Sequence, residues 1–204
     1  MSRIITLPVA TGVVALAASC LNAPTAHSAP IQAARPAAVT TVASGLFSPL
    51  SLEVTPNGTR YFAQSFAGTL HRQVPGKPPR TIYANKYGAE VGAVSVRDGR
   101  VRFAITGQRG STTLMGLGRE GTPFVVANLS RFEKRQNPDA KVTYGFRGLP
   151  SECAAQLPDG QPASYAGIVE SHPYASAQNA RGTTYVADAA GNSILSVGPR
   201  GAVR

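Results

Sequence analysis

Few side chains in this sequence of 204 residues are spaced for catalysis or metal binding. It contains three histidines, His27, His71 and His172, and their spacing matches no pattern of paired metal ligands. The ten acidic residues are scattered, so no close pair of carboxylates suggests acid–base chemistry. We therefore predict no catalytic, cofactor-binding or metal-binding residue and no resident cofactor.

The segment Glu170-Ser-His-Pro-Tyr174 is an exception, because it places a carboxylate, an imidazole and a phenol just before a predicted strand. In a fold whose sheets surround a central channel, such a position faces that channel. Glu170, His172 and Tyr174 are therefore candidate channel-facing residues. The alternative is a structural loop in which His172 and Tyr174 are hydrogen-bonded locally.

A second segment, Ala187-Asp-Ala-Ala-Gly-Asn192, is typical of a tight turn. Gly191 and Asn192 are expected to supply positive φ, and Asp188 to hydrogen-bond turn amides. In this interpretation Asp188→Ala costs about 1 kcal/mol, the scale of one charge-assisted hydrogen bond. The alternative makes Asp188 a cation ligand, with Ca²⁺ possible in an intact homologue.

The elements that would position these residues repeat along the chain. Three segments each read as an alternating strand, a glycine turn and a second strand that carries an aromatic residue. They occupy residues 51–63, 93–104 and 175–187. Their turn glycines are Gly58, Gly99 and Gly182. Phe62 and Phe103 are 41 residues apart, and Phe103 and Tyr185 are 82 apart, which is twice that period.

Four short strands repeated at about 40 residues are typical of β-propeller blades. We predict an all-β fold, a partial β-propeller equal to half of a six-bladed ring. Its blades lie near 46–88, 89–127 and 172–204, and a short helical and loop insertion, which begins with a helix over 129–136, occupies 128–171. The alternative for that stretch is a degenerate blade. Three blades cannot close a ring, so we expect a disrupted gene or an incomplete sequence.

The N-terminus has the charged start, apolar centre and small-residue end of a secretory signal peptide. We predict a signal peptide over 1–29, a linker over 30–44, and a secreted protein that does not span a membrane after cleavage. The alternatives are a membrane anchor and a lipoprotein modified at Cys20.

The net charge of +10 comes from dispersed arginines rather than a clustered stripe. We therefore expect no binding to nucleic acid, and a surface that attracts anionic polymers of the cell envelope. Without Cys20, Cys153 is the remaining cysteine. It has lost a disulfide partner, is an inert free thiol or, as the third alternative, is a nucleophile.

Three segments resemble the ScyD/ScyE family of secreted bacterial β-propeller proteins, which are related to NHL-repeat proteins. They are Val42–Pro49, Leu129–Asp139, and Gly167–Tyr174 followed by Gly182–Leu195. The sequence departs from the family at Gln64, where such units often carry an acidic residue, and it stops several strands earlier. The resemblance implies that the partner cysteine of Cys153 lies in that further portion.

Two function classes follow. The first is an exported, non-enzymatic binding or interaction β-propeller of the ScyD/ScyE type, whose partner, an envelope polymer or a protein, is unknown. The alternative is the remnant of a lactonase-like or lyase-like propeller enzyme with a metal site in its channel. The residues ahead of the innermost strands favour the first, because only the segment at His172 offers a ligand.

Overall fold

The computed structural model describes residues 38–118 and 120–204. The predicted signal peptide, and the part of the predicted linker before residue 38, lie outside these residues. All elements described here belong to the unit Thr41–Arg204. No helix in the described part of the chain is long and apolar enough to cross a membrane.

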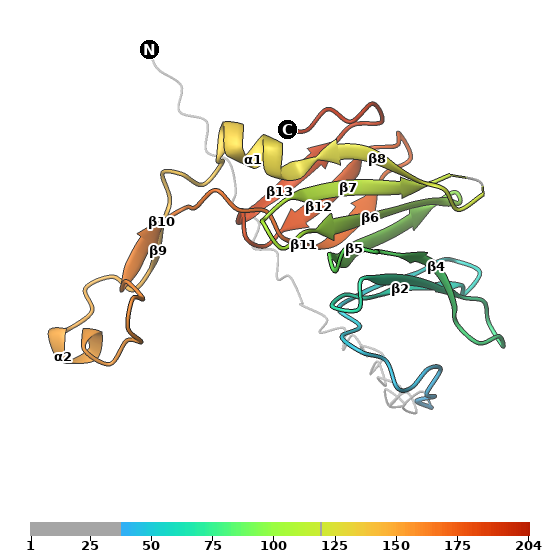
Figure 1. Ribbon diagram of the computed structural model, residues 1–204, viewed down its shortest axis with the longest axis horizontal. Helices are drawn as coiled ribbons and strands as arrows, with labels where there is room; N and C mark the ends of the chain where they lie inside the picture. The colour runs from blue at the N-terminus through green and yellow to red at the C-terminus, as the bar shows by residue number, and fades with distance from the viewer. Residues whose placement is uncertain (1–37, 119) are drawn as a thin grey trace, which may run out of the picture. The chain divides into compact units, whose positions relative to one another are not determined.

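The first sheet has four antiparallel strands that follow each other in chain order (Figure 1). They are β1 (Ser51–Val54), β2 (Arg60–Gln64), β3 (Thr69–Gln73) and β4 (Arg80–Ala84). The predicted turn glycine Gly58 joins β1 to β2 with a φ of 77°. This left-handed conformation explains why a glycine follows the first strand.

The second sheet repeats this order with longer strands. They are β5 (Glu90–Arg97), β6 (Arg100–Thr106), β7 (Thr112–Leu117) and β8 (Pro123–Asn128). The third sheet has three strands, β11 (Pro173–Gln178), β12 (Thr184–Asp188) and β13 (Ser193–Val197). An isolated bridge between Val197 and Val203 stands where the other sheets have a fourth strand.

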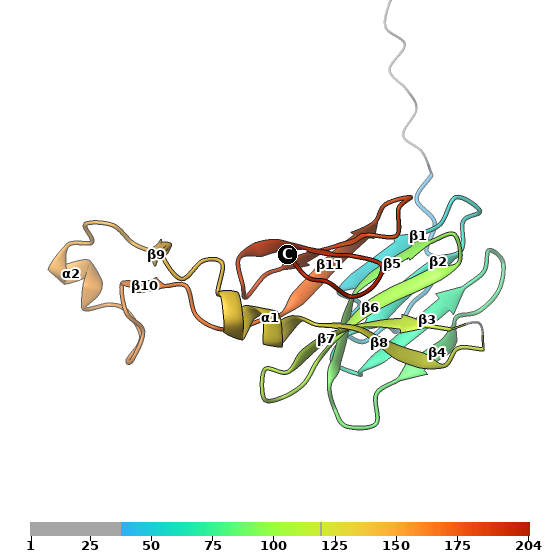
Figure 2. The ribbon, with the colours of Figure 1, turned by 90° about the horizontal axis from the view of Figure 1, so that it is seen from above.

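The first strand of each sheet lies beside the first strand of the next. β5 contacts both β1 and β11, so it stands between them. Figure 2 shows β1, β5 and β11 close together, with the later strands spreading outward. Each sheet therefore follows the previous one as propeller blades do. The predicted fold class, an all-β partial β-propeller, is confirmed.

A bulge in β5 joins the three sheets by hydrogen bonds. The pairing of β5 with β6 shifts between Gly92 and Ser95, which leaves backbone groups free for other partners. The Val94 N–H donates to Ser51 Oγ on β1 at 2.8 Å, and Ser176 Oγ on β11 donates to the Ala93 carbonyl at 2.6 Å. One irregular position thus bonds to both neighbouring sheets.

Two apolar clusters fill the spaces between the sheets. Phe103, Leu70 and Val91 lie at the centre of the cluster between the first and second sheets and are fully buried. Leu114 and Val186 belong to the cluster between the second and third sheets. These side chains come from alternate strand positions, which explains the two-residue periodicity of the sequence.

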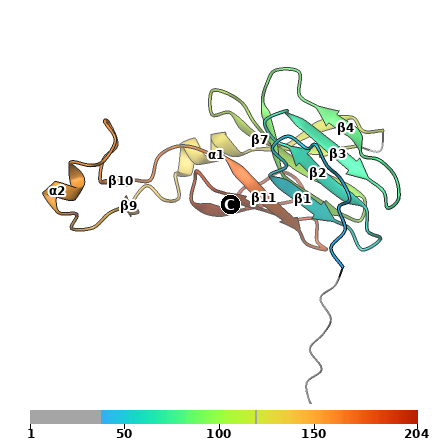
Figure 3. The same ribbon diagram turned by 90° about the horizontal axis from the view of Figure 1, so that it is seen from below.

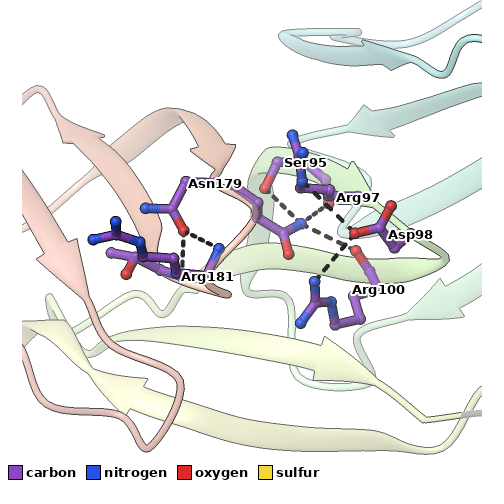
Figure 4. A network of polar contacts seen from close by, with 8 residues as sticks. Ser95, Arg97, Asp98, Arg100, Asn179 and Arg181 are labelled. Atoms are coloured by element: carbon purple, nitrogen blue, oxygen red, sulfur yellow. Dashed lines mark hydrogen bonds and ion pairs between the residues drawn. The ribbon is translucent and has the colours of Figure 1, made fainter.

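Polar contacts also join the second and third sheets. Gln178 Nε2 donates to the Ser95 carbonyl at 3.1 Å and to the Arg100 carbonyl at 3.0 Å. Figure 4 shows Ser95 and Arg100 near the turn that carries Asn179 and Arg181. Asn179 Oδ1 accepts from the Arg181 N–H at 3.0 Å, which fixes the hairpin between β11 and β12.

The segment between the second and third sheets forms two helices and a small hairpin. The predicted helix over 129–136 is present as α1 (Leu129–Gln136). The rest, predicted to be loop, also contains a hairpin of β9 (Thr143–Gly145) and β10 (Ser164–Ala166) around the short helix α2 (Ser151–Ala154). Figure 3 shows this hairpin away from the sheets. β11 contacts β5 and β6 directly, so the two-stranded β9–β10 sheet does not lie between the second and third sheets.

Candidate functional site

The structure brings two of the three candidate channel residues together. His172 lies just before β11, and its ring stacks on Tyr174 at 4.8 Å between centroids. His172 Nε2 also lies 2.9 Å from Glu90 Oε2 at the start of β5. The side chains of His172 and Glu90 are 25% and 31% exposed, so the pair is open to solvent.

Glu90 is a member of this site that the sequence analysis missed. It is 82 residues before His172, and only the packing of β5 against β11 places the two together. A carboxylate can orient an imidazole by accepting its N–H. Among the described residues, no hydroxyl or thiol is hydrogen-bonded to the imidazole of His172.

The third candidate, Glu170, belongs to a different place. It lines a cavity of about 380 Å³ beside α1, together with Arg109, Arg131, Glu133 and Lys134. The predicted group of Glu170, His172 and Tyr174 is therefore split: His172 and Tyr174 join Glu90, and Glu170 faces a mostly cationic hollow.

Asp188 binds the residues just before β11 as well as its own turn. Its carboxylate accepts hydrogen bonds from Ser171 Oγ at 2.5 Å and from the His172 N–H at 2.7 Å. It also accepts from the Gly191 N–H at 3.3 Å. Asp188 is 2% exposed, and these three donors occupy both of its oxygens.

The first sheet performs the same task with a different residue. Gln64 ends β2 as Asp188 ends β12, and Gln64 Oε1 accepts from the Phe47 N–H at 2.6 Å. In both sheets a side chain at the end of the second strand therefore binds the backbone just before the first strand. Compared with Asp188, Gln64 also offers an acceptor oxygen but carries no charge.

One detail predicted for the β12–β13 turn is wrong. Asn192 has the positive φ expected of it, 47°, whereas Gly191 is not among the residues with positive φ. Gly191 leaves little room for a side chain, because a Cβ there would lie 3.3 Å from both Glu133 Oε2 and the Glu170 carbonyl. α1 and the loop before β11 thus pack on the backbone of this turn.

Three buried carboxylates meet where α1 contacts this turn. Glu133, Asp139 and Asp188 are 1%, 4% and 2% exposed. Asp139 Oδ2 accepts from Asn192 Nδ2 at 3.0 Å, and the Asn137 amide, oriented to satisfy its neighbours, donates to Glu133 and Asp139. Burial, followed by the charges of Asp188 and Asp139, raises the pKa of Glu133 to about 7.

These carboxylates do not form a recognisable metal centre. Within the described part of the chain, no group of three His, Cys, Asp or Glu side chains has the geometry to hold a metal ion. Asp188 accepts three hydrogen bonds, which hold its carboxylate toward the backbone before β11 and toward its own turn.

The helix α1 carries a set of exposed cations next to the carboxylates. Arg131, Lys134 and Arg135 are exposed, and Arg131 borders two cavities. One is the 380 Å³ cavity described above, and the other, of about 520 Å³, lies between α1 and the C-terminal segment. We refer to Arg131, Lys134 and Arg135 as the cationic face of α1.

Cys153 lies in α2 and is exposed as a free thiol. The described residues contain no second cysteine with which it could pair, since Cys20 falls outside them.

Comparisons with known proteins identify no family. No family model matches the chain, and no curated protein matches it. Among solved structures, the chain is similar to selenomethionine-substituted virginiamycin B lyase from Staphylococcus aureus, at 12% identity and a TM-score of 0.47, over 80% of this chain and 42% of that one. A protein of unknown function from Bacteroides caccae gives 15% identity and a TM-score of 0.41, over 76% and 44%. The chain spans less than half of either structure, and similarity at this level does not identify an activity.

Proposed function

We propose that this protein is an exported, non-enzymatic binding β-propeller of the ScyD/ScyE type, and that it binds an acidic polymer of the cell envelope through the cationic face of α1. The observation that carries this proposal is the arrangement of unpaired cations along two adjoining cavities. Export rests on the predicted signal peptide over 1–29 and is part of the proposal.

The cations of α1 are free to bind an external anion. Among the described residues, ion pairs link Arg97 and Arg100 to Asp98, and Glu90 to His172, but none includes Arg131, Lys134 or Arg135. Guanidinium groups bind carboxylate and phosphate through paired hydrogen bonds. This face therefore has the chemistry to bind carboxylate or phosphate groups.

The shape of the face fits a chain better than a small molecule. The two cavities meet at Arg131, so anionic groups along one polymer could contact both. The 520 Å³ cavity also exposes apolar surface from Phe132 and Val203, against which the ring of a sugar can pack. An acidic polysaccharide combines these two chemistries.

The experiment compares two triple variants on immobilised alginate, a polymer of uronic acids. R131Q/K134Q/R135Q removes the cationic face, whereas K77Q/R80Q/K86Q removes the same charge from exposed positions near β4. We expect R131Q/K134Q/R135Q to weaken binding about tenfold or more and K77Q/R80Q/K86Q to have little effect. The reason is that charges in direct contact with the polymer contribute more to binding than distant charges, which salt screens. Equal losses in both variants would contradict a specific face.

The second candidate, a lactonase-like or lyase-like propeller enzyme, is favoured by one observation, the contact of His172 with Glu90. Both side chains can bind a metal, but a catalytic site normally supplies three protein ligands. Titration of Mg²⁺, Mn²⁺, Zn²⁺ and Ca²⁺ into the wild type and His172→Ala tests it. Thermal stabilisation that depends on His172 would favour the enzyme, and none would favour binding.

A further inference from the structure

Glu133 is a buried side chain with an unsatisfied oxygen. It lies on α1 and is 1% exposed, and its Oε2 has no hydrogen-bond partner among the described residues. A buried carboxylate oxygen without a donor is costly, because it has lost its water and gained nothing in exchange. A protonated carboxyl would remove that cost.

Oxygen atoms of Glu133, Glu170 and Ser193 border the same side of Gly191. A Cβ added to Gly191 would lie 3.3 Å from Glu133 Oε2, 3.3 Å from the Glu170 carbonyl oxygen and 3.4 Å from Ser193 Oγ. Three oxygens therefore face one small space, and Ser193 Oγ also lacks a partner. A protonated Glu133 carboxyl has an O–H to donate and leaves no unpaired negative charge in this space.

The charged groups nearby favour the neutral form. Burial, followed by the negative charges of Asp188 on β12 and Asp139 after α1, raises the pKa of Glu133 to about 7. The charged groups that line the adjoining cavity with Glu133 are Glu170, Arg109, Arg131 and Lys134. None of these three cations forms an ion pair with Glu133 among the described residues.

We propose that Glu133 is a protonated acid that fastens α1 to the turn between β12 and β13, and that its ionisation loosens α1 from the third sheet. The inference concerns the docking of α1 and does not depend on the proposed ligand. It makes the position of α1 sensitive to pH near neutrality.

The direction of the effect follows from the two states of Glu133. When α1 is docked its pKa is about 7, and when it is released the pKa returns toward 4.5. Glu133 therefore makes its full contribution to the stability of docked α1 below about pH 4.5, and this contribution is lost as the pH rises through 7. Between about pH 6 and pH 8.5, this shift corresponds to a loss of about tenfold in the docking equilibrium.

Hydrogen exchange of the amides of α1 measures docking directly. In the wild type, protection over Leu129–Gln136, corrected for the intrinsic exchange rate, should fall about tenfold over that pH range. Glu133→Gln keeps the shape and cannot ionise, so its protection should be constant. Glu152→Gln, on exposed α2 in the same segment, should behave as the wild type. Parallel profiles for all three proteins would overturn the proposal.

Two further measurements keep the test valid if Glu133→Gln does not fold. The side-chain carboxyl resonance of Glu133 in the wild-type protein should titrate with a midpoint near 7, and a midpoint below about 5 would overturn the proposal. Addition of Ca²⁺ at alkaline pH should not restore protection. Full restoration would mean that the space holds a cation instead of a proton, which also overturns it.

Discussion

The contacts of Asp188 predict an unusually large effect for one substitution. Asp188→Ala removes the acceptor of Ser171 Oγ, the His172 N–H and the Gly191 N–H at once. Asp188 is 2% exposed, so water cannot easily replace the carboxylate. The variant leaves three polar groups without their partner at the junction of α1, β11 and β12.

The magnitude follows from the individual bonds. An unsatisfied buried donor costs about 1 to 3 kcal/mol, and the 3.3 Å bond from Gly191 is the weakest of the three. We therefore expect Asp188→Ala to lower the free energy of unfolding by about 3 to 5 kcal/mol. This exceeds the value of about 1 kcal/mol that the sequence alone suggests for a turn residue. Asp188→Asn keeps one acceptor oxygen and should cost about half as much.

Gln64 supplies the matched control, because it holds the same position in the first sheet. Gln64→Ala removes the bonds of its amide to the Phe47 N–H, which is near solvent, and to His71 Nε2, and should cost about 1 to 2 kcal/mol. Urea unfolding followed by circular dichroism at pH 7 measures all three variants. If Asp188→Ala costs no more than Gln64→Ala, the carboxylate does not organise the junction and our reasoning is wrong.

Three other predictions test neighbouring features. Gly191→Ala should cost about 1 to 2 kcal/mol in thermal denaturation, because its Cβ would press on Glu133 and Glu170; an unchanged melting temperature would mean that α1 moves away freely. Asp188→Asn should shift the titration of Glu133 downward, because the charge of Asp188 raises the pKa of Glu133, and an unchanged midpoint would refute this coupling. Cys153 should react with a maleimide in the native protein within minutes, because it is exposed; slow labelling would contradict its position.

The repeat period and the glycine turns made the fold predictable. Gly58, Gly99 and Gly182 all have positive φ and lie between the first and second strands of their sheets. The local signal is strong there, because a hairpin needs a left-handed residue wherever its strands turn back. The helix over 129–136 was predictable for the same reason, because its ends are fixed by nearby residues.

The β9–β10 hairpin was not predictable in the same way. Its strands have three residues each, too few to show a periodic pattern. Tyr144 packs against Tyr165 across the pair at 5.7 Å between ring centroids. That contact joins residues separated by a long turn-rich segment, so no local rule indicates it.

The candidate sites were harder to predict from the sequence, because their residues come from separate elements that meet only in the fold. Glu90 meets His172 and Glu133 meets Asp188 only after separate elements pack together. The sequence places a residue on a strand or helix, but the sheet order decides which distant residue faces it. Residue types therefore indicated His172 and Asp188, while their partners required the fold.

The difference between Gln64 and Asp188 connects the fold to the proposed regulation. Both side chains bind the backbone ahead of a first strand, but the neutral amide in the first sheet leaves no charge behind. The third sheet uses a carboxylate, and α1 places Glu133 close enough for its pKa to rise. Gln64 and Asp188 can therefore both bind the backbone before a first strand. Only Asp188 changes the pKa of a neighbouring group, because α1 packs Glu133 beside it. The pH sensitivity we propose belongs to that junction and not to the repeated blade.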